Sequence, residues 1–187
     1  MKKEIHQDLD TTPALAKLLD YSNITLEEIV ETIGVEVTLP SGYDREYDVL
    51  ILLDTGKPMV PYIIKEFKIP KDSNIESVSV NLSNPVEIHN IFIEPAQPPV
   101  PGGGEGWWRY ITPPPYTIDN ETYASSEPYP GKEYVYKESV GIDPDTHRQV
   151  KHVVVYIYPI QYIPAESRIV AYRNASVSLA YWTAVEE

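Results

Sequence analysis

The chain has 187 residues, a formal net charge of −13 at pH 7 and no cysteine. The missing cysteine excludes disulfides, cysteine-ligated zinc and a thiol nucleophile in this chain, and the acidic balance disfavours a nucleic-acid partner. Its 15 tyrosines and 18 prolines indicate half-exposed sheet faces, sheet edges and turns more than long helices, because proline cannot donate to a sheet ladder.

Targeting features point in two directions. No apolar run approaches the ~20 residues of a membrane span, so we expect none. The first ten residues, MKKEIHQDLD, are charged and do not read as a signal peptide. The chain is therefore either intracellular or separated from a targeting segment. Four N-x-S/T sequons favour export, at Asn23, Asn81, Asn120 and Asn174.

The N-terminal part contains one ambiguous segment. Pro13–Asp20 predicts one or two helical turns with proline at the first helical position. Thr25–Ile33 has apolar residues at helical spacing and a Thr25/Glu28 capping box, but Ile33–Leu39 alternates like a strand with one buried face. We favour a strand over residues 29–39. Residues 1–23 are interpreted as an N-terminal extension, and 24–187 as the domain.

The rest of the chain alternates between short apolar segments and turns. The segments recur about every ten residues, which is typical of a sandwich or barrel. A proline- and glycine-rich connection, Pro95–Pro115, interrupts them, and a turn at Asp143–Asp145 separates two later strands. We therefore predict an all-β, antiparallel β-sandwich with long proline-rich loops and little helix. The predicted strands are residues 47–53 (buried), 62–70, 75–83, 86–95, the pair flanking 143–145, and 168–182.

No residue pattern predicts catalysis, a cofactor or a metal centre. His147 and His152 would lie on opposite faces of one strand, which does not suit a shared metal. Asp143, Asp145 and Asp119–Glu121 could ligate calcium, but turn-forming roles explain them equally well and are favoured. No serine lies in a nucleophile elbow, so we expect a protein that is not an enzyme.

Trp107 and Trp108 lie beside Arg109 in the proline-rich connection. They indicate a functional site more clearly than the histidines and acidic residues do. Adjacent tryptophans in such a loop suit stacking on a sugar or anchoring a protein partner. The two tryptophans could equally well fold back onto the domain and cover an edge of its core. Both interpretations stay open on the sequence alone.

Three stretches resemble the propeptides of gingipain-type cysteine peptidases. GKPMVPYIIKEFKIP (residues 56–70) resembles the family's G-x-P-x-x-P pattern that leads into a strand. FIEPAQPPVP (92–101) is similar to the proline-rich segment that follows, and HVVVYIYPIQYIPAESRIVAYRNASVSLAY (152–181) is similar to the closing block of two strands around a P-x-x-Y-x-P turn. The resemblance covers roughly residues 24–182.

The resemblance implies an exported, non-catalytic β-sandwich prodomain, secreted or at the cell surface. Such a prodomain acts as intramolecular chaperone and inhibitor of a caspase-like cysteine peptidase catalytic domain, and places a basic residue in the active site. Arg148 best matches the family's Arg-Gly, although Gln149 replaces the glycine, and Arg109 is its competitor. The alternative function is a surface carbohydrate- or protein-binding sandwich that uses Trp107 and Trp108.

The strand at residues 152–158, HVVVYIY, has apolar side chains on both faces. Val153, Val155 and Ile157 form one face, and Val154, Tyr156 and Tyr158 form the other. Because a sandwich strand normally presents a polar outer face to water, the second face needs a cover. Either the proline-rich connection or the peptidase domain could supply it.

Overall fold

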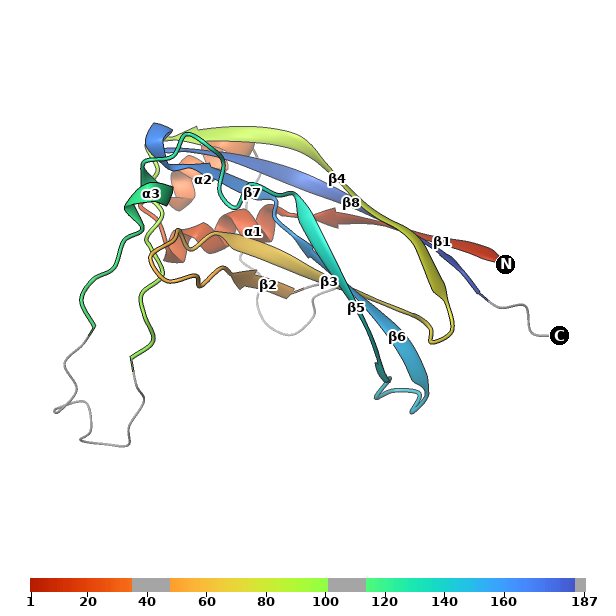
Figure 1. The fold of residues 1–187 in the computed structure, drawn as a ribbon. Helices are drawn as coiled ribbons and strands as arrows, with labels where there is room; N and C mark the ends of the chain where they lie inside the picture. The colour runs from red at the N-terminus through yellow and green to blue at the C-terminus, as the bar shows by residue number, and fades with distance from the viewer. Residues whose placement is uncertain (35–47, 101–113, 184–187) are drawn as a thin grey trace.

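The computed structural model describes residues 1–34, 48–100 and 114–183 (Figure 1). Two antiparallel four-stranded sheets stack face to face, and short helices lie at one end of the stack. The alternation of apolar and polar residues produces this arrangement, because each strand turns one set of side chains into the common core. The predicted antiparallel β-sandwich with little helix is confirmed.

The first sheet is built around the last strand. β8 (Arg168–Trp182) pairs on one side with β4 (Asn74–His89). On its other side it pairs with β7 (Ile160–Ile163) and then with β1 (Lys2–Asp10). The inward positions of β8 are fully buried, and they include Ala175, Val177 and Leu179.

The second sheet has the order β2-β3-β6-β5. Its strands are β2 (Asp48–Ile51), β3 (Pro61–Pro70), β6 (Gln149–Ile157) and β5 (Tyr134–Ile142). The predicted strand pair around the turn at Asp143–Asp145 is confirmed as the β5–β6 hairpin. Inward side chains of β3 and β6 meet the first sheet in the core, among them Ile63, Phe67, Val153, Val155 and Ile157.

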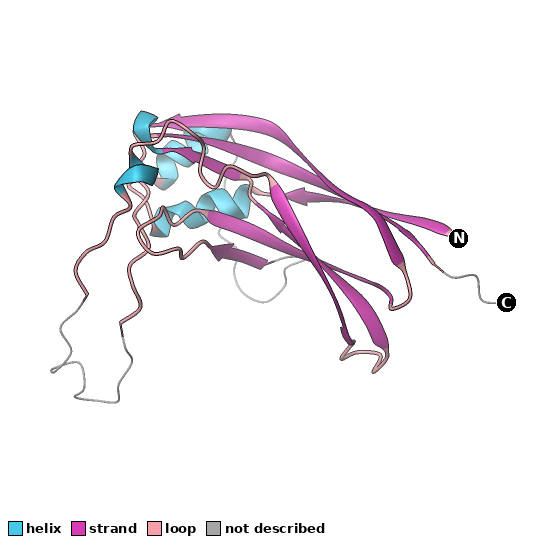
Figure 2. Ribbon diagram, viewed as in Figure 1, coloured by secondary structure: helices cyan, strands magenta, loops and turns pink. Residues whose placement is uncertain are grey.

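Short helices close one end of the sandwich (Figure 2). They are α1 (Thr12–Lys17), η1 (Leu18–Asp20), α2 (Leu26–Ile33), α3 (Asn120–Tyr123) and η3 (Pro164–Glu166). The helical turns predicted at Pro13 are confirmed, with the proline in the first turn of α1. Leu15 and Leu18 enter the same core as the sheets. Within the described residues, no helix is both long and apolar enough to cross a membrane.

The predicted strand over residues 29–39 is wrong over its first part. Residues 26–33 form α2, capped by reciprocal hydrogen bonds between Thr25 and Glu28, and Gly34 ends the helix at φ 65°. The capping box and the left-handed glycine therefore outweigh the short alternating pattern. Residues 35–39 lie outside the described residues.

Three further details differ from the sequence prediction. Two predicted strands, residues 75–83 and 86–95, are joined in the single strand β4, which ends at His89. The strand predicted as buried around residues 47–53 is the edge strand β2, with Leu50 45% exposed. Residues 1–23 supply β1 and part of the core. As a domain boundary, residue 23 stays a prediction.

Candidate partner-binding surface

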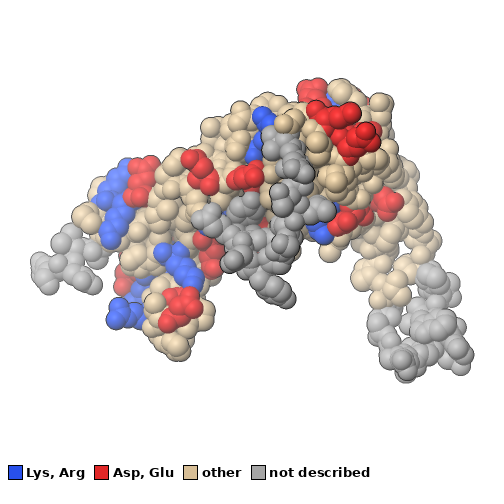
Figure 3. Space-filling model, turned by 180° about the vertical axis from the view of Figure 1, so that it is seen from behind, with Lys and Arg blue, Asp and Glu red and all other residues tan. Residues whose placement is uncertain are grey.

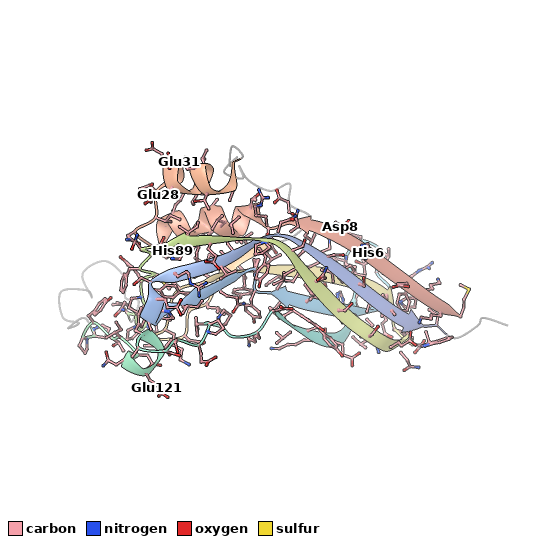
Figure 4. The ribbon with its side chains drawn as sticks, turned by 90° about the horizontal axis from the view of Figure 1, so that it is seen from above. His6, Asp8, Glu28, Glu31, His89 and Glu121 are labelled. Carbon is pink, nitrogen blue, oxygen red and sulfur yellow. The ribbon has the colours of Figure 1, made fainter. Side chains whose placement is uncertain are left out.

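The outer face of the β1-β8-β4 sheet is polar along its middle, and Tyr172 and Trp182 of β8 lie nearer its two ends. Outward positions carry His6, Asp8, Ser176 and Ser178, and the His6 ring contacts both hydroxyls, at 2.9 Å from Ser178 and 3.1 Å from Ser176. Figure 4 looks onto this sheet and labels His6 and Asp8 on β1 and His89 at the end of β4. These groups can all be hydrated, so the middle of this face needs no cover.

The outer face of the β2-β3-β6-β5 sheet carries apolar side chains around Ile64 and Tyr156, with the charged Asp48 and Glu66 on the same outward rows. The strand register places Ile64 of β3 opposite Tyr156 of β6, and Tyr156 opposite Val135 of β5. These side chains and Val154 are half-buried, whereas Leu50 of β2 is more exposed. Ile64, Tyr156 and Val135 lie at matched positions on neighbouring strands and form a continuous surface, which Val154 extends along β6 between Glu66 and Lys137. We call Leu50, Tyr62, Ile64, Val135, Val154 and Tyr156 the apolar face.

A cluster of tyrosines lies at the centre of the apolar face. The ring of Tyr62 is 6.2 Å from that of Tyr156 and 5.8 Å from that of Tyr158, and both pairs are tilted by 35°. Burial, and then the neighbouring Tyr156, raise the pKa of Tyr62, so its hydroxyl stays neutral. Lys132 and Lys137 place their ammonium groups over the rings of Tyr158 and Tyr156, at 5.1 and 5.7 Å. The cluster therefore combines aromatic area with a cationic rim.

Arg148 lies at the tip of the β5–β6 hairpin and is exposed. The tip is closed by two backbone hydrogen bonds: the Asp143 N–H donates to the Arg148 carbonyl at 2.9 Å, and the His147 N–H donates to the Asp143 carbonyl at 2.8 Å. His147 adopts φ 56°, a left-handed conformation in which the turn reverses the chain. The arginine therefore projects from a defined turn.

The Asp143 side chain fixes this turn to the sheet. Its carboxylate accepts hydrogen bonds from Lys68 Nζ of β3 at 2.5 Å and from Thr146 Oγ1 at 2.6 Å. The bond from Lys68, followed by the bond from Thr146, lowers the pKa of Asp143 to about 2. A buried carboxylate thus joins the hairpin tip to the strand that carries Ile64 and Tyr62. We call the Lys68–Asp143–Thr146 contact the tip latch.

Comparison with protein families matches the model Propeptide_C25 over residues 48–186. The chain belongs to this family. The predicted resemblance to gingipain-type propeptides is thereby confirmed. No curated protein matches.

Two solved structures are similar to this propeptide. The complex of Porphyromonas gingivalis RgpB pro- and mature domains is 19% identical at a TM-score of 0.49, covering 74% of this chain and 69% of that chain. A structure of gingipain K from Porphyromonas gingivalis, which concerns its zymogenic latency, is 16% identical at a TM-score of 0.49. That match covers 73% of this chain and 71% of the other.

Trp107, Trp108 and Arg109 of the propeptide lie outside the described residues, so their proposed roles stay predictions. The described base of their loop is held together by Gln97. Its side chain donates to the Thr117 carbonyl at 3.0 Å and accepts from the Thr117 N–H at 2.9 Å, as a paired backbone would. The described ends of this loop lie at the helical end of the sandwich, and the hairpin tip lies at the opposite end (Figures 1 and 3).

The acidic residues considered for calcium have structural partners in the propeptide. Asp119 caps α3 by accepting from the N–H groups of Glu121 and Thr122, and Asp143 belongs to the tip latch. Asp143 therefore has the turn-forming role that the sequence favoured, whereas Asp119 caps a helix. Within the described ranges, no group of three or more acidic or histidine side chains is arranged to hold a metal ion.

The two histidines of the hairpin occupy different settings. His147 lies in the turn and not on a strand as predicted, while His152 faces outward from β6 with its Nδ1 2.5 Å from Glu66. Sequence reasoning also missed Tyr62, Lys132 and Lys137. The alternation of Tyr62 and Ile64 with buried neighbours signals an apolar outer face on β3, but only the register shows that Tyr156 lies beside it.

Proposed function

We propose that this propeptide is a non-catalytic, exported prodomain that assists folding of a gingipain-like cysteine peptidase domain and inhibits it. Membership in the propeptide family supports this role. The observation that carries it is an exposed Arg148 on a turn that the tip latch holds to the sheet. A guanidinium held in this way can enter an acidic specificity pocket without first having to be ordered.

Inhibition would follow from the chemistry of that contact. A guanidinium forms bidentate, charge-assisted hydrogen bonds with a carboxylate, and the tip latch keeps the turn in one conformation. The peptidase active site would then be occupied by a group that the turn holds in place. Arg109 remains the competing residue for this role.

The test is inhibition of the separately expressed cognate catalytic domain by the full chain. Arg148→Ala is expected to raise the inhibition constant roughly thirty-fold or more, since truncating one partner of a buried charged pair costs ~2–5 kcal/mol. Lys71→Ala is the matched control, because Lys71 is a neighbouring cation that bonds to Gln149 at 3.3 Å. Arg109→Ala is assayed beside them. Inhibition that is lost only with Arg109→Ala assigns the role to the tryptophan loop.

The tyrosine cluster is the observation that bears on the alternative, a carbohydrate-binding surface. Flat sugar rings stack on exposed, coplanar aromatic rings. Here Tyr62 is tilted by 35° against both neighbours, and Tyr158 is only 5% exposed. A protein partner fits the cluster better, because its side chains can pack against rings that are not coplanar.

A further inference from the structure

We propose that the hairpin tip presents Arg148 as an inhibitor and not as a substrate. The tip latch keeps the Arg148–Gln149 peptide bond in a conformation that resists hydrolysis, while the arginine side chain remains exposed and able to enter a specificity pocket. This inference rests on the proposed function and deepens it, because it gives the latch a role in how long inhibition lasts.

An exposed arginine on a surface turn is ordinarily a site of proteolysis. In the reaction, the nucleophile of the peptidase attacks the Arg148 carbonyl carbon, and the carbonyl oxygen takes up negative charge. The Gln149 nitrogen then leaves with a proton as the new amine, and water releases Arg148 from the peptidase as a carboxylate. A peptidase that only binds the guanidinium is therefore inhibited, whereas one that also reaches the carbonyl cuts the chain.

The Arg148 carbonyl is already engaged inside the turn. Its oxygen accepts a hydrogen bond from the Asp143 N–H at 2.9 Å. This bond continues the β5–β6 ladder by one pair beyond Ile142 and Gln149, so the oxygen points into the hairpin. Hydrolysis needs the same oxygen to face the N–H donors of an oxyanion hole. The Arg148–Gln149 bond is therefore shielded until its hydrogen bond to Asp143 breaks.

The backbone on both sides of the bond is also unsuited to cleavage. A peptidase recognises an extended segment, because it binds the main chain beside the cleaved bond as well as the side chain. His147 instead adopts a left-handed conformation at φ 56°. On the other side, Gln149 and Val150 pair with β5, and Val150 pairs with β3 as well. Cleavage therefore requires the end of the hairpin to separate.

The tip latch opposes this separation. Asp143 is only 5% exposed, and its carboxylate joins Thr146 inside the turn to Lys68 on β3. Opening the turn would leave a buried carboxylate without its donors, which is unfavourable. Proteolysis of a folded chain follows the population of its locally opened form, so the latch should lower the rate of cleavage. The Arg148 side chain takes no part in the latch and keeps its access to a pocket.

The experiment digests the folded full chain with trypsin, which cuts after arginine and lysine, and follows cleavage of the Arg148–Gln149 bond by mass spectrometry. A synthetic peptide of residues 142–152 is the unstructured reference. We expect the wild-type bond to be cut at least about a hundredfold more slowly than the peptide, and the Lys68→Gln chain to be cut roughly tenfold faster than wild type. Lys68 lies outside the cleaved segment, so this change leaves the sequence that trypsin reads intact.

Two further variants complete the test. Lys137→Gln is the matched control, because Lys137 belongs to the same hairpin but lies over the ring of Tyr156 and should leave cleavage unchanged. Asp143→Ala removes both latch contacts and should give the larger increase. The Arg173–Asn174 bond, in the middle of β8 between β1 and β4, reports unfolding of the whole sandwich in the same digest. Faster cleavage at both bonds means that a variant has unfolded, and Lys68→Gln gives the result if Asp143→Ala has.

A wild-type bond that is cut as fast as the peptide overturns the inference. Folded Lys68→Gln and Asp143→Ala chains that stay as resistant as wild type overturn it too, because the latch would then not protect the bond. The digest does not involve the cognate catalytic domain, so its result is independent of the proposed function, which fails if the wild-type chain does not inhibit that domain. Where wild type inhibits, the Lys68→Gln chain should inhibit at first and lose its effect as the turn is cut.

Discussion

The two outer faces of this sandwich differ although they flank the same core. One carries His6, Ser176 and Ser178, whose polar atoms bond to one another, and the other carries Tyr62, Ile64 and Tyr156. Packing inside the domain demands nothing of either face, because the inward positions already fill the core. The difference therefore does not arise from packing in the core but from the side chains that each sheet turns away from it.

The largest change in stability is expected at an inward-facing position of β6, in comparison with the outward-facing position beside it. Val155→Ala is expected to lower the free energy of unfolding by about 2–3 kcal/mol, since Val155 is fully buried, and Val154→Ala by less than ~1 kcal/mol. Urea unfolding of the two variants measures this. Equal losses would mean that the chain itself packs against the apolar face.

A smaller effect is expected at the tip latch, and it should depend on pH. The pKa of Asp143 is about 2 in the folded protein, below the ~3.9 of an unfolded chain. The lowered pKa stabilises the folded state above about pH 4, and this contribution is lost as the pH falls through about 2. The difference in Tm between wild type and Asp143→Asn should therefore be largest above about pH 4 and shrink toward pH 2.

Thermal unfolding across this range tests the latch. Lys68→Gln removes the lysine that contributes most to the lowered pKa of Asp143. The difference in Tm between this variant and wild type should therefore also shrink toward pH 2. A Tm difference that is the same at every pH would show that the carboxylate charge does not hold the turn.

The smallest effect should come from the polar face. Ser178→Ala removes a hydroxyl that contacts His6 at 2.9 Å in an exposed position. We expect stability to stay within about 0.5 kcal/mol of wild type and binding of the catalytic domain to be unchanged. Weakened binding would place the partner on this face and remove the contrast between the two sheets.

Much of the fold could be predicted from local alternation. β3, β6 and β8 place apolar residues at most of their alternate positions, with Lys65, Lys151 and Arg173 as interruptions, and most of these apolar side chains are almost completely buried. β1 gave no such signal, since only Leu9 is buried among its nine residues. It is ordered by pairing with residues of β8 that lie more than 160 positions further along the chain, and such pairing leaves no local pattern.

The break predicted within β4 has a local cause. Asn84, at φ 54°, and Pro85 read as a turn, but β4 is an edge strand and pairing with β8 resumes at Pro85. A proline is tolerated at an edge because its missing N–H need not face a second strand. α2 was missed for the opposite reason, since the capping box was visible but an alternating pattern followed it directly.

The candidate site was predictable only in part. The turn that carries Arg148 follows from Asp143-Pro144-Asp145. The tip latch and the tyrosine cluster need the register between β3 and β6, which joins Lys68 to His152 and Ile64 to Tyr156. Residues so far apart in sequence are brought together by the packed sandwich, and no local pattern encodes their contact.

The central position of β8 in its sheet also determines when the strands of that sheet can pair during synthesis. β1 and β4 do not pair with each other, and both depend on residues 168–182, which a ribosome makes after both of them. During synthesis the second sheet can begin from its β2–β3 and β5–β6 neighbours, whereas the first sheet has to wait. Long-range pairing of this kind is slow and leaves strand edges exposed meanwhile. We therefore expect a nascent chain that stops before residue 168 to remain sensitive to proteases, and to become resistant only once β8 is complete.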